Sequence, residues 1–135
     1  MSNETVSLQS LLVASKSVTV DYPGLEGFKL DVAFLAREEL VKIRKKSTSV
    51  VYKNRQPDET LNDELFLKLY VEACIKGWEG LKFSHLAQLA PVDISKQKPD
   101  DTLAYSTENA LYLMKSSSNF DSFISETVTE LANFQ

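Results

Sequence analysis

The sequence has few of the residues that most readily indicate a catalytic or metal-binding site. It contains one cysteine, Cys74, and one histidine, His85, in 135 residues. A lone cysteine cannot form an internal disulfide, and inside a predicted helix we expect it to be a small buried side chain. Neither Cys74 nor a tight carboxylate cluster stands at metal-ligand spacing from His85, so no metal site is predicted. No nucleophile elbow accompanies His85, and we expect no catalytic residues and no enzymatic activity.

Glycine and long apolar runs are scarce as well. The four glycines form neither a dinucleotide-binding motif nor a phosphate-binding loop, so no cofactor is expected. No apolar run approaches the roughly 20 residues of a membrane span, and the N-terminus lacks a basic signal region. We therefore expect a cytosolic protein. A net charge of -4 and a pI near 5.0 give no attraction to nucleic acid or to anionic membranes, and neither is an expected partner.

The length suits one domain with its own core. Residues 1–16 are polar at their start and lack periodicity, which predicts a flexible N-terminal segment. Residues 17–135 are then expected to form a single helical domain. Within it, residues 91–106 hold two prolines and many polar groups, which predicts a long exposed loop.

The most strongly patterned stretch, residues 59–81, predicts a central helix on which the other elements pack. Thr60 and Asp63 have the spacing of a capping box, and Gly77 suits a left-handed residue that ends the helix. Apolar residues fill most of the circumference outside one charged lane, which is more than a surface helix carries. The charges of that lane alternate in sign at four-residue steps, at Glu64, Lys68, Glu72 and Lys76.

Alternation of apolar residues predicts a small β-hairpin near the N-terminus, with a turn at Pro23 and Gly24. The short run of β-prone residues at 50–52 predicts a brief extended segment. Residues 84–90, 107–115 and 118–131 have the capping and periodicity of helices. The expected fold class is mainly α within α+β, with helices packed round the central helix and one small N-terminal hairpin.

Two groups of residues are candidate contacts with a partner protein. The predicted helix 36–46 ends in Arg44, Lys45 and Lys46 and forms the one basic patch of an acidic chain. It is either a solvated helix face or a site for an acidic partner. Phe134 stands one position from the end of the chain, where it is either core or an exposed contact.

Several short pieces, in order and spacing, resemble the tail assembly chaperones of long-tailed (siphovirus-type) bacteriophages. The resemblance covers roughly residues 17–134. It is carried by residues 18–24 (VTVDYPG), 34–43 (FLAREELVKI), 77–81 (GWEGL), 105–111 (YSTENAL) and 119–124 (NFDSFI).

This resemblance implies a non-enzymatic phage protein that acts in the host cell cytoplasm and is absent from the mature virion. Its client would be the tape measure protein, which it would bind and keep soluble while tail tube subunits are recruited. Self-association is expected, and many members also exist as a longer frameshifted product. The alternative is a small virion structural protein, such as a head-tail adaptor or a tail terminator.

Overall fold

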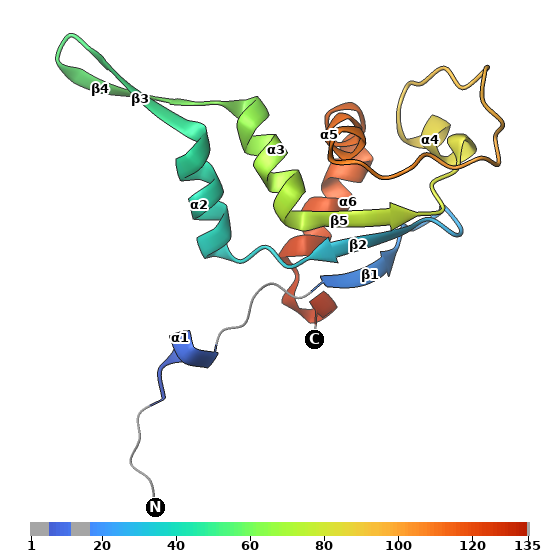
Figure 1. Ribbon diagram of the computed structural model, residues 1–135, viewed down its shortest axis with the longest axis horizontal. Coiled ribbons are helices and arrows are strands. Elements are labelled where there is room, and N and C mark those ends of the chain that lie inside the picture. Colours follow the sequence, from blue (N-terminus) through green and yellow to red (C-terminus); the bar gives the residue numbers. More distant parts are fainter. Residues whose placement is uncertain (1–5, 12–16, 135) are drawn as a thin grey trace, which may run out of the picture.

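The computed structural model describes residues 6–11 and 17–134, and combines a three-stranded sheet, a separate two-stranded hairpin and several helices (Figure 1). Much of the predicted flexible segment, residues 1–16, lies outside this description. The elements are α1 (Leu8–Leu11), β1 (Ser17–Asp21), β2 (Lys29–Ala33), α2 (Arg37–Ser47), β3 (Thr48–Lys53), β4 (Gln56–Leu61), α3 (Asp63–Cys74), β5 (Ile75–Glu79), α4 (Phe83–Leu89), α5 (Thr107–Ser116), α6 (Ser118–Thr129) and the 3-10 turn η1 (Leu131–Phe134).

The three-stranded sheet is antiparallel in the order β1-β2-β5. The β1–β2 hairpin agrees with the one predicted from alternation. Because side chains alternate between the two faces of a sheet, one face is apolar and packs against the helices. The other face is polar, and there the Thr19 hydroxyl donates to Asp31 Oδ1 at 2.6 Å. The apolar face is formed by Val18, Val20, Leu30, Val32, Ile75 and Trp78.

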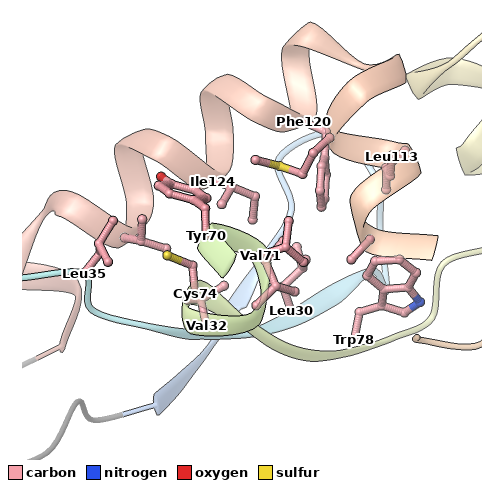
Figure 2. Close-up of a cluster of buried hydrophobic side chains, with 14 of the residues drawn as sticks. Leu30, Val32, Leu35, Tyr70, Val71, Cys74, Trp78, Leu113, Phe120 and Ile124 are labelled. Atoms are coloured by element: carbon pink, nitrogen blue, oxygen red, sulfur yellow. The ribbon is translucent and has the colours of Figure 1, made fainter. Parts of the chain in front are cut away.

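The core lies between this apolar face and helices α3, α5 and α6. Figure 2 shows Val71 and Cys74 of α3 and Ile124 of α6 directed into one cluster above Leu30 and Val32. All five of these side chains are fully buried. Burying a large aliphatic side chain contributes about 1.5–3 kcal/mol, so this cluster is the main source of stability.

The structure corrects the prediction of helices packed round a central helix. Of the predicted helix 59–81, only α3 is helical, since its first residues belong to β4 and its last form β5. In α3 only Tyr70, Val71 and Cys74 are buried. Gly77 pairs with Asp31 in the sheet and has no positive φ, so it does not end a helix. The fold is α+β, with the sheet as the layer on which the helices pack.

The physical reason for this correction is a long-range pairing. Ile75 and Trp78 lie opposite Val32 and Leu30 of β2, where they are buried on the apolar face. The gain from burying them in the sheet outweighs the local helical pattern. Glu64, Lys68, Glu72 and Lys76 are all exposed, as the charged lane predicts, but Lys76 lies in β5 and only the first three are on the helix.

The predicted loop, residues 91–106, contains no helix or strand apart from an isolated bridge between Lys82 and Thr102. Its last part is fixed to the core. The Trp78 indole donates to the carbonyl of Leu103 at 2.9 Å, and the Tyr105 hydroxyl donates to the carbonyl of Ile75 at 2.8 Å. Trp78 is therefore a packing residue that also holds the loop.

Candidate protein-binding site

A long and almost wholly exposed element is the β3–β4 hairpin, residues 48–61, which we call the arm. Figure 1 shows it projecting beyond α2 and α3, away from the three-stranded sheet. Every residue of the arm except Thr48 is exposed. Its base is closed by a hydrogen bond from the Asn62 N–H to the carbonyl of Ser47 at 2.8 Å. The arm is therefore held to the body through the helices at its two ends.

The tip of the arm is a two-residue turn formed by Asn54 and Arg55. Their φ angles are 52° and 65°, so both adopt the left-handed conformation of a type I′ turn. This turn matches the twist of a two-stranded ribbon, and asparagine is common in it. Arginine occupies the second position, where glycine is usual because a Cβ makes positive φ unfavourable.

The two faces of the arm differ in polarity. Strand register places Val50 and Tyr52 on the same face as Pro57 and Leu61, together with Thr48 and Glu59. Because four of these six residues are apolar, we call this the apolar face of the arm. Tyr52 is 74% exposed and Val50 is 50% exposed. The opposite face is largely polar and carries an ion pair of 3.7 Å between Lys53 Nζ and Asp58 Oδ2. An exposed apolar face on a projecting ribbon is typical of a contact surface.

A groove of about 430 Å³ runs between α2 and the apolar face of the arm. Its apolar lining comes from Val41, which is 42% exposed, and from Val50. Arg44 and Lys45 supply two positive charges against the single negative charge of Glu59. The remaining lining residue is Thr48, whose hydroxyl donates to the carbonyl of Arg44 at 2.7 Å. The groove thus offers apolar surface beside net positive charge.

The structure brings together the predicted basic contacts and the arm. Arg44, Lys45 and Lys46 are all exposed at the end of α2 that leads into β3. Among the described residues, none of the three forms an ion pair within 4.0 Å. The Arg44 guanidinium lies 6.0 Å from the centre of the Phe66 ring, a cation–π arrangement. These positive charges are available to a partner.

Phe134, the other predicted contact, lies elsewhere. It is 6% exposed in η1, and its ring centre is 5.6 Å from that of Phe34. In this structure the ring is part of the core at the end of the sheet and does not join the groove. Mutation of Phe134 would therefore disturb core packing, and any effect on partner binding would be indirect.

The structure also shows the surroundings of Cys74 and His85. Among the described residues, no three His, Cys, Asp or Glu side chains gather at metal-binding distance. Burial raises the pKa of the Cys74 thiol to about 12, which keeps it protonated and unreactive near neutral pH. His85 is half-buried, and its Nδ1 accepts from the Lys82 N–H at 3.4 Å. Within the same residues, no helix has the length and apolar character to cross a membrane.

Sequence reasoning did not identify the arm as part of the site. Residues 50–52 were predicted to be extended, but residues 53–58 lack the Asn-Gly or Asp-Gly pair that usually marks a hairpin. Asn54 was the one usable turn signal. The apolar face of the arm follows only once the pairing of Tyr52 with Pro57 is known.

Comparison with known proteins identifies a family. The model of a family described as YdaY prophage protein matches residues 35–135, which include α2, the arm and every later element. No curated protein and no solved structure matches the chain.

Proposed function

Since the chain belongs to the YdaY prophage protein family and is therefore phage-derived, we propose that it is a tail assembly chaperone. It binds the tape measure protein, keeps it soluble and helps to recruit tail tube subunits. It acts in the host cytoplasm without enzymatic activity, self-associates and leaves before the virion is complete. The resemblance described from the sequence supports the specific role within phage assembly.

The observation that carries the proposal is the exposed apolar face of the arm, with the groove at its base. Tyr52 and Val50 are held in solvent on a ribbon that makes little contact with the protein's own core. Exposed apolar side chains on a projecting element favour association with another apolar surface. A tape measure protein, a long helical rod with apolar stripes, presents such surfaces.

The charge distribution supports a protein partner rather than nucleic acid. The chain carries a net charge of -4, and the described acidic residues include Asp58 and Glu59 on the arm itself. A long phosphate backbone would be repelled by the acidic surface of the chain, whereas a short acidic protein segment would meet the net positive charge of the groove, where Arg44 and Lys45 outnumber Glu59. Many weak contacts of this kind along a rod would together hold it in solution.

Co-expression with the tape measure protein tests the proposal. The soluble fraction of the tape measure should rise several-fold when the chaperone is present and should fall back when Val50 and Tyr52 are both changed to serine. Val51→Ser on the other face of the arm is the matched control, since it removes a similarly exposed valine. A tape measure that stays equally insoluble with and without the wild-type chain would refute the chaperone function.

Mass spectrometry of purified virions provides an independent test. A chaperone should be absent from the particles while present in the infected cell. Stoichiometric amounts in the particle would instead identify a virion structural protein, such as a head-tail adaptor or a tail terminator.

A further inference from the structure

The two long edges of the arm differ in their ability to accept another strand. In a hairpin with a two-residue turn, the residues that flank the turn form a hydrogen-bonded pair, and such pairs alternate with non-hydrogen-bonded ones. Lys53 and Gln56 flank the turn here. It follows that Val50 and Tyr52 on β3 direct their backbone N–H and C=O groups away from β4. Pro57 and Glu59 on β4 direct theirs away from β3.

The edge of β4 is blocked. Pro57 occupies an outward-facing position of β4, and proline has no backbone N–H. At that position β4 therefore cannot donate a hydrogen bond to an added strand. Proline on an edge strand is a common means of preventing further pairing. The neighbouring outward position holds Glu59, whose charge also opposes apolar packing on that edge.

The edge of β3 is open. Its sequence from Thr48 to Lys53 is TSVVYK, which is rich in β-branched and aromatic residues and has its only charge at the end. Among the described residues, no backbone bond from another element reaches the outward groups of Val50 or Tyr52. β3 therefore presents unpaired donors and acceptors beside the apolar face of the arm.

The charges at the base of β3 indicate what kind of strand fits. Arg44, Lys45 and Lys46 end α2 immediately before β3, so a strand added to β3 would end beside them. A second copy fits poorly in the symmetric antiparallel pairing centred on Val50. With Val50 opposite Val50, Arg55 of one copy would approach Lys45 of the other, and like charges would repel. An added strand with an acidic end would instead be attracted by these three basic residues.

We propose that the open edge of β3 binds an extended segment of the client protein, outside its helical rod, by strand addition. The segment has alternating apolar residues beside Val50 and Tyr52 and carboxylates beside Arg44 and Lys45. The backbone bonds provide affinity, and the groove lined by Val41 and the basic residues provides specificity. The inference rests on the proposed function for the identity of the client, and on the geometry of β3 for the mode of binding.

The first test is a binding titration by fluorescence anisotropy with a synthetic probe. The probe is a labelled peptide of about ten residues, with alternating valine and threonine and two glutamates at its C-terminus, for antiparallel pairing. A peptide of the same sequence with every second amide N-methylated cannot donate to β3. We expect the first peptide to bind and the second to bind at least about tenfold more weakly, as for loss of backbone hydrogen bonds. Equal binding of the two peptides would overturn the inference.

Two proline substitutions locate the edge. Tyr52→Pro removes an outward N–H from β3, and Glu59→Pro removes one from β4, while neither removes a bond within the arm. Tyr52→Pro should weaken peptide binding about tenfold beyond Tyr52→Thr, which loses the ring but keeps the N–H. Glu59→Pro should leave it within about twofold of the wild type. The opposite ranking would place the peptide on β4 and would contradict the inference.

The role of the basic residues beside β3 is tested by two double charge-reversal variants, both on α2. Arg44→Glu with Lys45→Glu should lower peptide affinity at least about tenfold at low salt, and the loss should shrink as salt rises. Arg37→Glu with Lys42→Glu makes the same change of net charge, away from the groove, and should change affinity less than about threefold. Equal losses from the two variants would show attraction by net charge alone and would overturn the charge assignment.

Two further results separate this inference from the proposed function. If the peptide binds at β3 while the tape measure stays insoluble, strand addition stands and the chaperone function fails. If the tape measure is solubilised equally by wild type and Tyr52→Pro, strand addition fails and the chaperone function stands. Sedimentation that shows a wild-type dimer, lost in Tyr52→Pro, would assign the edge to a second copy and overturn the inference.

Discussion

The protein contains two antiparallel hairpins of similar length, of which one is buried in the core and the other is exposed to solvent. The β1–β2 hairpin gains a third strand, β5, and its Leu30 and Val32 are fully buried. The arm gains no further strand among the described residues, and its Val50 and Tyr52 remain in solvent. A two-stranded hairpin alone is marginally stable in water. The first hairpin is therefore part of the core, and the second persists because α2 and α3 hold its ends.

This difference assigns separate tasks to the two regions. The sheet and its helices supply stability, so changes there should unfold the protein. The arm contributes little to the core, and regions with few buried contacts are those that open or adapt most readily. We therefore expect mutations in the arm to affect partner binding while leaving the global stability almost unchanged.

The largest effect should come from a truncation in the sheet. Leu30→Ala removes a fully buried side chain and should lower the free energy of unfolding by about 2–5 kcal/mol. Val50→Ala on the arm should lower it by less than about 0.5 kcal/mol. Urea denaturation followed by circular dichroism measures both. Similar losses from the two variants would show that the arm belongs to the cooperative core.

The next largest effect should arise where β5 meets the turn of the first hairpin. Gly80 has a φ of 72°, and a Cβ there would overlap the backbone carbonyl of Gly27. Gly80→Ala should therefore destabilise the protein by about 1–3 kcal/mol. The matched control is Gly77→Ala, whose Cβ would lie 3.4 Å from an Asp31 carboxylate oxygen and whose backbone has no positive φ. A stability loss in Gly77→Ala as large as in Gly80→Ala would refute this explanation.

The sequence predicted the buried hairpin better than the rest of the sheet. The alternation of Leu30 and Val32 and the turn at Pro23 and Gly24 are local signals, and the structure confirms them. β5 carries no comparable local signal, because the charges at Glu72 and Lys76 continue the helical spacing. Its partners in β2 are more than forty residues away along the chain, so only tertiary packing decides its conformation.

The smallest effect should come from the tip of the arm. Arg55→Gly relieves positive φ at the second turn position and should stabilise the arm locally by up to about 1 kcal/mol. Arg55→Ala also removes the charge but keeps a Cβ, so it should give no such gain. Hydrogen exchange of the arm amides measures the difference. Faster exchange in Arg55→Gly than in Arg55→Ala would contradict the turn assignment.

The candidate site was predicted in part. Arg44, Lys45 and Lys46 were identified from the order of charges along one helix, which is a local property. All three are exposed, and Arg44 and Lys45 line the groove. The apolar half of the site needs the register that puts Tyr52 opposite Pro57, and register is not visible in a segment that lacks a standard turn pair. The burial of Phe134 against Phe34 is equally a matter of long-range packing.

The measurement that most directly tests the division between core and contact surface is co-expression of the tape measure protein with an armless variant. Residues 49–60 are replaced by a short glycine-containing turn, which can join Thr48 to Leu61 because these two residues are paired neighbours across the arm. Denaturation of the purified variant should show the free energy of unfolding changed by less than about 1 kcal/mol. The tape measure should return to the insoluble fraction. A stable armless variant that keeps the tape measure as soluble as the wild type does would contradict the assignment of the arm as the client-binding surface.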